Sequence, residues 1–148
     1  WLCLSRNSVS TPVGNAVTWM SLRPARPGVT VALCAPPVPC GAAAAALLAR
    51  NNVSVTPATQ ELDVRAVLGK VMADEVDAGI VYATDVRAVG TRVASVPIPA
   101  SGNVTTTYPV ARVSAAPNPV AAGIFVSYLR FTPSAQGILR AYGFGRPW

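Results

Sequence analysis

The chain has 148 residues, of which 51% are hydrophobic and 12% are charged. This composition excludes a disordered chain, and the length is sufficient for one domain with a buried core. The formal net charge is +6, but the arginines are spaced singly and no aromatic residues are interleaved with them, so we expect no nucleic-acid partner.

The absence of histidine narrows the chemistry further. Without histidine there is no Ser-His or Cys-His nucleophile system and no zinc site of the usual Cys/His kind. Cys40 could act as a nucleophile only with a base to activate it, and the sequence offers none. We therefore predict no catalytic residue and no enzymatic activity, and we also predict no metal site. The sequence contains no uninterrupted run of about 18 apolar residues, so it predicts no membrane-spanning helix.

Hydrophobic periodicity and turn signals predict alternating strands and helices. Such alternation is typical of an α/β fold with a largely parallel sheet flanked by helices. In chain order we expect a poorly defined lead-in at 1–28 with a short strand at 1–4, a strand at 29–34, a proline loop at 35–39, a helix at 40–50, a strand at 53–56, a loop at 57–63, a helix from 64, a strand at 78–82, a short helix at 86–89 capped by Asp85, strands at 93–98 and 108–113, and two helices after Asn118 and Thr132.

Two cysteines flank the proline loop, and two interpretations stay open for them. Cys34 and Cys40 form a disulfide in an oxidising compartment, or they are two small buried side chains. The spacing alone does not decide between them, because a disulfide requires a specific geometry.

Ligands of parallel α/β sheets bind beyond the carboxyl ends of the strands. Two predicted helices begin there, and each directs free backbone N–H groups and the positive end of its dipole toward that edge. We therefore predict an oxyanion site formed by the backbone N–H of Cys40, the backbone N–H of Val64 and the hydroxyl of Tyr82. The plainer alternative is an ordinary strand–helix unit in which Val64 and Tyr82 are packing residues.

Three neighbouring residues, Pro39, Gly41 and Asp63, bear on this prediction. Pro39 and Gly41 flank Cys40, and Gly41 has no side chain to keep a ligand away from the backbone. Asp63 is a natural N-cap. Its carboxylate is compatible with a bound anion only if it caps its helix and does not face the ligand.

Five segments, in this order and spacing, resemble the C-terminal half of the molybdate-binding proteins of ABC importers. The segment at 77–85, DAGIVYATD, and the closing Tyr142-Gly143-Phe144 carry most of the resemblance, which covers residues 29–148. The matching segments are residues 31–41, 63–65, 77–85, 108–111 and 137–144.

The resemblance implies one lobe of a type II periplasmic-binding fold, with the first lobe missing. Family members hold a tetrahedral oxyanion, molybdate or tungstate, between two α/β lobes through neutral groups. Carried over by motif, the N–H groups of Cys40 and Val64 and the hydroxyl of Tyr82 are the ligand donors of the second lobe. This lobe would comprise residues 29–108, and residues 109–148 would form a crossover strand and helices that pack on the absent lobe.

The same resemblance implies partners and a location. The partners are the permease and ATPase of an ABC importer, with no cofactor beyond the molybdate or tungstate ligand. The location is periplasmic or extracytoplasmic, with the signal segment absent from this chain and membrane association through the transporter or a missing lipid anchor. We also expect weakened binding, together with exposed apolar patches, self-association or marginal stability. The alternatives are an effector-sensing domain of a transcription regulator and a binder of another tetrahedral oxyanion such as sulfate.

Overall fold

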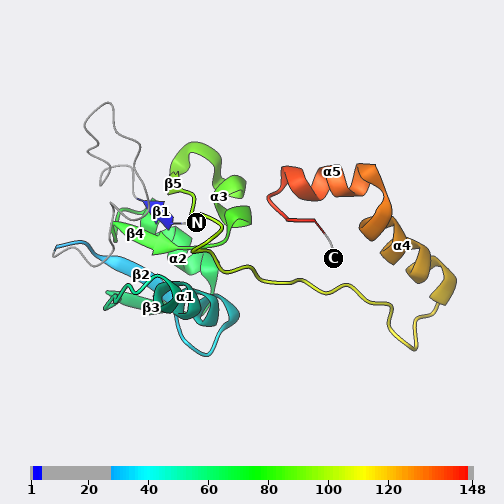
Figure 1. Ribbon diagram of the computed structural model, residues 1–148, viewed down its shortest axis with the longest axis horizontal. Coiled ribbons are helices and arrows are strands. Elements are labelled where there is room, and N and C mark those ends of the chain that lie inside the picture. Colours follow the sequence, from blue (N-terminus) through cyan, green and yellow to red (C-terminus); the bar gives the residue numbers. More distant parts are fainter. Residues whose placement is uncertain (1, 5–27, 147–148) are drawn as a thin grey trace. The chain divides into compact units, whose positions relative to one another are not determined.

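The computed structural model describes residues 2–4 and 28–146, which fall into two compact units, Trp1–Thr105 and Thr106–Trp148. Figure 1 labels the helices and strands of both units. The first unit contains β1 (Leu2–Leu4), β2 (Val31–Cys34), α1 (Pro39–Arg50), β3 (Thr59–Glu61), α2 (Val64–Met72), β4 (Ala78–Ile80), α3 (Ala83–Val89), the 3-10 turn η1 (Gly90–Arg92) and β5 (Ala94–Val96). The second unit contains α4 (Pro119–Phe131) and α5 (Pro133–Ala141).

The described strands form one five-stranded sheet in the order β3-β2-β4-β1-β5. β2 is parallel to both β3 and β4, whereas β1 is antiparallel to both β4 and β5. Four of the five strands therefore run in one direction, and β1 runs against them. This confirms the predicted α/β fold with a largely parallel sheet, and it confirms the short strand expected at the start of the chain.

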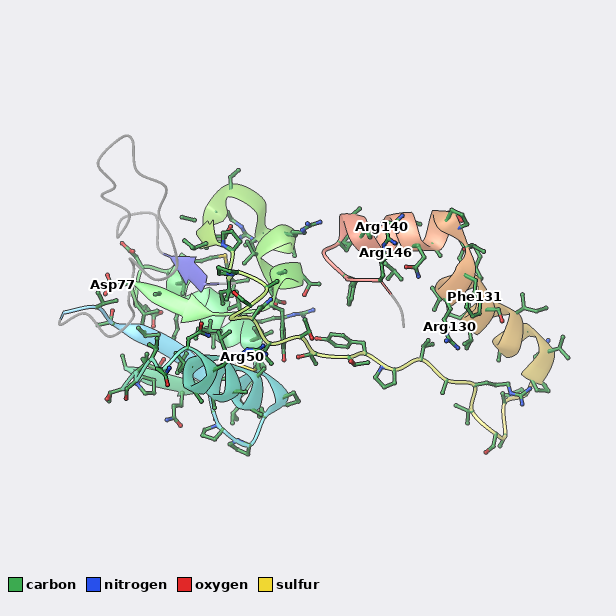
Figure 2. All side chains as sticks on the ribbon, in the orientation of Figure 1. Arg50, Asp77, Arg130, Phe131, Arg140 and Arg146 are labelled. Carbon is green, nitrogen blue, oxygen red and sulfur yellow. A yellow bond between two sulfur atoms is a disulfide. The ribbon has the colours of Figure 1, made fainter. Side chains whose placement is uncertain are left out.

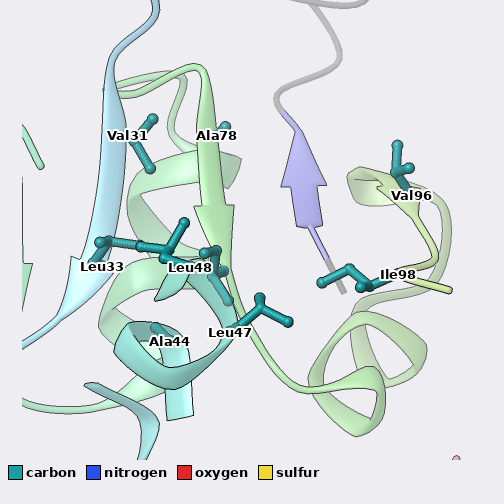
Figure 3. Packing of buried hydrophobic residues seen from close by; sticks show 9 residues of the cluster. Val31, Leu33, Ala44, Leu47, Leu48, Ala78, Val96 and Ile98 are labelled. Atoms are coloured by element: carbon teal, nitrogen blue, oxygen red, sulfur yellow. The ribbon is translucent and has the colours of Figure 1, made fainter. Parts of the chain in front are cut away.

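The alternating residues of β2 enter two separate cores, one on each face of the sheet. Val31 and Leu33 pack with Leu47 and Leu48 of α1, as Figure 3 shows. Ala32 and Cys34 point to the opposite face and share a cluster with residues of α2 and α3, such as Val67. All four residues of β2 are buried. A strand that is apolar at every position must be covered on both faces, and α1 and α2 provide this cover.

The helix starts and ends of the first unit match local signals in the sequence. α1 begins with Pro39, which needs no N–H acceptor in the first turn, and it ends at Asn51 and Asn52, the latter in a left-handed conformation (φ 52°). α2 begins directly after Asp63. These predictions are confirmed to within one or two residues.

The strand predicted at residues 53–56 is wrong. Val53 and Val55 do pack against the core, but the Val53 N–H donates to the Leu48 oxygen at 3.0 Å and so completes the end of α1. The free edge of β2 is taken by β3, in a segment predicted to be a loop, and the Ala58 N–H donates to the Val31 oxygen at 2.8 Å. Pairing with a distant strand overrode the local alternation.

The short helix predicted at residues 86–89 begins earlier, at Ala83, and Tyr82 is its N-cap. Asp85 lies inside the first turn, where its carboxylate accepts the Tyr82 N–H at 3.2 Å. The predicted capping role of Asp85 is therefore exerted from the third helical position, as in a capping box.

The second unit holds two helices and no strand within the described residues. The strand predicted at residues 108–113 is wrong, because this segment has no strand partner in its own unit. α4 begins at Pro119 after the N-cap Asn118, whose side chain accepts the Ala121 N–H at 3.0 Å. No residue of α4 is buried, so the predicted apolar exposure of this region is confirmed, while self-association stays a prediction. None of the described helices is long and apolar enough to cross a membrane.

Candidate functional site

The carboxyl ends of three parallel strands meet at one edge of the sheet. β3, β2 and β4 are neighbours in this order and run in the same direction, so the chain leaves each of them at the same edge. A helix follows each strand: α2 after β3, α1 after β2 and α3 after β4. The topology therefore brings the starts of these helices, with Val64, Cys40 and Tyr82, to the edge where ligands of such sheets bind.

Cys40 is the second residue of α1 and is bonded to Cys34, the last residue of β2, in a disulfide with a Cα–Cα distance of 5.6 Å. This decides between the two interpretations of the sequence in favour of the disulfide. The Cys40 side chain also packs against the same cluster as the Val64 side chain. Among the described residues, the Cys40 N–H has no hydrogen-bond acceptor.

Gly41 is buried, and the space that a side chain would need is filled by the chain itself. A Cβ atom at this position would lie 1.9 Å from the Ala35 oxygen and 2.5 Å from the Ala35 carbonyl carbon. Close packing of the loop on the helix is therefore sufficient to require glycine here. The role of Gly41 in ligand approach and the supporting role of Pro39 stay predictions.

Val64 is the first helical residue of α2, and the carboxylate beside it is committed to the helix. Asp63 is the N-cap, and its Oδ1 accepts the Ala66 N–H at 2.9 Å. An anion site beside Asp63 requires that its carboxylate caps the helix, and this requirement is met. The N–H groups of Val64 and Arg65 have no acceptor among the described residues, as expected for the first turn of a helix.

Tyr82 follows β4 by two residues and is partly exposed as the N-cap of α3. The Asp85 carboxylate that accepts its N–H is partly buried, and burial raises the pKa of Asp85, while the charge of Arg65 opposes that rise. The bond links the residue that carries the phenol to the first turn of α3. Sequence reasoning missed this contact, although the three-residue spacing of Tyr82 and Asp85 is the signal for it.

The three carboxylates near this edge each have a partner. Glu61, at the end of β3, lies 3.9 Å from the Lys70 Nζ, and Asp63 and Asp85 each accept a backbone N–H. No cluster of three or more metal-ligating side chains occurs in the part of the chain that the structure describes. The groups at this edge are suited to hold an anion by hydrogen bonds and offer no carboxylate cage for a cation.

An α/β lobe with several helix starts at one sheet edge has the architecture of a binding domain for a small anion. A family model described as bacterial extracellular solute-binding protein matches residues 3–145. The chain therefore belongs to the family of bacterial extracellular solute-binding proteins.

Individual relatives point in the same direction. The chain is 34% identical over 122 residues to the molybdate-binding protein ModA of Mycobacterium bovis and of Mycobacterium tuberculosis; the match covers 82% of this chain and 46% of each relative. A solved structure assigned as the substrate-binding domain of a molybdenum ABC transporter from Clostridium difficile matches with a TM-score of 0.75 and 24% identity, over 99% of this chain and 62% of that one. That likeness supports the fold, and the chain spans about half the length of its curated relatives.

Proposed function

We propose that this chain carries part of the oxyanion site of an ABC-importer substrate-binding protein and binds molybdate or tungstate. The donors are the backbone N–H groups of Cys40 and Val64 and the hydroxyl of Tyr82. The observation that carries the proposal is the meeting of these three positions at one sheet edge, with two N–H groups that have no protein acceptor among the described residues. The names of the relatives supply the chemical class of the ligand.

The two backbone N–H groups can only donate, so they favour anion oxygens that carry no proton. Molybdate, tungstate and sulfate are fully deprotonated at neutral pH, whereas hydrogen phosphate would have to turn its O–H away from both N–H groups. An N–H group left without an acceptor costs about 1–3 kcal/mol, so we expect phosphate to bind least well. Size then separates sulfate from the two larger metal oxyanions.

The proposed role is binding and delivery, with no catalysed reaction. The family description is extracellular, and we extend it to a periplasmic or otherwise extracytoplasmic location. The permease and ATPase of the importer are the proposed partners, which receive the anion from the binding protein. The Cys34–Cys40 disulfide supports this location, because disulfides persist in oxidising compartments.

The test is a calorimetric titration of the 148-residue chain with molybdate, tungstate, sulfate and phosphate, each up to millimolar concentration. We expect heat from molybdate and tungstate and none from phosphate. Binding of sulfate or phosphate without either metal oxyanion would refute the ligand assignment.

A pair of variants at one position tests the backbone donor directly. Val64→Pro removes the N–H of the first helical residue, where proline is well tolerated, and Asp63 before it is already extended (φ −149°, ψ 161°). Val64→Ala keeps the N–H and removes part of the side chain. Since a hydrogen bond to a charged group contributes about 1.5–3 kcal/mol, the proline variant should bind at least tenfold more weakly than the alanine variant. Equal affinities would exclude the Val64 N–H as a ligand donor.

A further inference from the structure

The starts of α1 and α2 are fixed by different means. In α2 the Asp63 side chain accepts the Ala66 N–H. In α1 the N-cap position is Val38, which makes no side-chain cap, and the first turn is instead joined by a covalent bond between Cys40 and Cys34. The disulfide thus stands where a capping side chain would otherwise fix the helix start.

Backbone hydrogen bonds also hold that turn, since the Gly41 and Ala42 N–H groups donate to the Val38 oxygen at 2.9 and 3.0 Å. The loop between the two cysteines itself has few N–H groups to offer. Three of its five residues are prolines and have no N–H to donate. The Ala35 N–H donates to the Glu61 oxygen at 2.7 Å, and the Val38 N–H donates to the Ala35 oxygen at 3.2 Å. Both donors are used before the chain reaches Cys40, so the disulfide is the direct connection between that residue and the sheet.

Cys34 is a firm anchor for this connection. It is 5% exposed, lies in the core beneath α2 and is in register with Glu61 of β3. Any freedom that α1 gained at its start would move the Cys40 N–H, whereas Cys34 would stay in place. The cross-link therefore acts on the position of one backbone donor.

We propose that the Cys34–Cys40 disulfide is a positioning element for anion binding that holds the Cys40 N–H at the sheet edge. This inference rests on the proposed function of the same site. Because coupling between two equilibria is reciprocal, the bound anion makes the disulfide harder to reduce by the same factor by which the disulfide strengthens binding.

The first test compares two variants with the unaltered chain. Cys34→Ala/Cys40→Ala removes the cross-link but keeps the residue 40 N–H. Asp77→Ala is the matched control, because it removes a carboxylate that accepts the Thr30 N–H and hydroxyl at 2.8 and 2.6 Å, at the opposite edge of the sheet. Figure 2 labels Asp77 at that edge. We expect the cysteine variant to bind molybdate about tenfold more weakly and the Asp77 variant to bind as the unaltered chain does.

Reduction makes the same comparison in the unaltered sequence. A water-soluble trialkylphosphine takes up the oxygen of one water molecule and becomes the phosphine oxide, and the two hydrogens of that water end on the two cysteine sulfurs. Tungstate is the titrant here because it resists reduction. A thermal melt in the same buffer confirms that the reduced chain is folded, and we expect tungstate to bind to it about tenfold more weakly than to the oxidised chain.

The outcomes distinguish a failure of the positioning role of the disulfide from a failure of the proposed anion-binding function. If the unaltered chain binds molybdate and the cysteine variant binds it equally well, the positioning role is refuted and the function stands. A loss of equal size in the Asp77 variant also refutes it, since the effect would then follow general stability. If the unaltered chain binds no anion, both proposals fail together; if it binds sulfate instead, the cysteine comparison is decided with that anion.

Discussion

The two compact units differ in how they bury apolar residues. The first unit has a core on each face of its sheet, and its large exposed hydrophobic residues within the described region are Leu62 and Met72. In the second unit the buried residues among those described are Ala135 and Gln136. Its large hydrophobic side chains are at the surface: Tyr108, Val110, Val113, Val120, Ile124, Phe125, Tyr128, Phe131, Ile138, Tyr142 and Phe144.

Helix formation and the burial of apolar side chains therefore have separate origins in this chain. α4 and α5 have local support: a proline at each start, the Asn118 cap, and a bond from the Gln136 Nε2 to the Leu129 oxygen at 2.5 Å. Such interactions form helices but bury little apolar surface, which is the larger source of stability. Apolar burial within the second unit therefore contributes little to its stability.

The largest expected contrast comes from matched truncations of one aliphatic side chain in each unit. Leu47 is 3% exposed in the core beneath α1, whereas Ile124 is 65% exposed on α4. Leu47→Ala should lower the free energy of unfolding by about 2–5 kcal/mol, and Ile124→Ala by less than about 0.5 kcal/mol. Urea denaturation followed by circular dichroism measures both. A large loss at Ile124 would contradict the comparison and reveal a hidden partner for α4.

A smaller loss of stability is expected at the hydrogen bonds between Thr30 and Asp77, which we call the clasp between β2 and β4. The Asp77 carboxylate accepts two hydrogen bonds from Thr30, and the Asp77 N–H donates to the Thr30 hydroxyl at 3.0 Å. Asp77→Ala should therefore cost about 1–3 kcal/mol of unfolding free energy. Asp77→Asn, which keeps an acceptor, should lose clearly less in the same urea experiment. Equal losses would mean that the charge, and not the acceptor, holds the clasp.

A local effect is expected in the second unit. Asn118→Ala removes the acceptor for the Ala121 N–H and should destabilise α4 by about 1 kcal/mol. Because neither core of the first unit contains a residue of the second unit, the unfolding midpoint of the first unit should not change. Hydrogen exchange of the α4 amides, read beside the urea midpoint, distinguishes the two. A shift of that midpoint would show that α4 contributes to the stability of the first unit.

The smallest effect concerns Asp85. Burial raises the pKa of its carboxyl in the folded chain, so the folded state holds this proton to a higher pH than the unfolded state does. The contribution of this group to stability is therefore greatest below its ordinary pKa and declines as the pH rises through the raised value. Asp85→Asn still accepts the Tyr82 N–H and removes this decline. We expect the variant to be no less stable at pH 7, with the relative gain absent at pH 3; a less stable variant at pH 7 would contradict the assignment.

Elements with local signals were predictable from the sequence. Asp63 and Asn118 mark the starts of α2 and α4 because a capping side chain bonds to the turn that it precedes. β3 was missed because its sequence, Thr-Gln-Glu, is polar and becomes a strand through its pairing with β2. The strand expected at residues 108–113 failed for the same reason in reverse, since it has the composition of a strand and no neighbour in its unit.

The candidate site shows the same division. The alternation of strands and helices along the chain could be predicted, and with it the expectation that Cys40, Val64 and Tyr82 share the edge at the carboxyl ends of the strands; the order of the strands in the sheet was not predicted. The disulfide could not, because a separation of six residues is compatible with bonded and unbonded cysteines. The packing of Gly41 against Ala35 was also beyond the sequence, since it depends on how the proline loop folds back.

Because β1 is an interior strand between β4 and β5, the first few residues are decisive for the continuity of the sheet. Among the described strands, β5 is hydrogen-bonded only to β1, whose partners on its two sides are β4 and β5. A preparation shortened by four residues would divide the sheet along this seam and leave Val96 and Ile98 without a backbone ladder behind them. Trimming of the amino end, whether by design or by a contaminating protease, would therefore produce a different molecule and not a slightly smaller one.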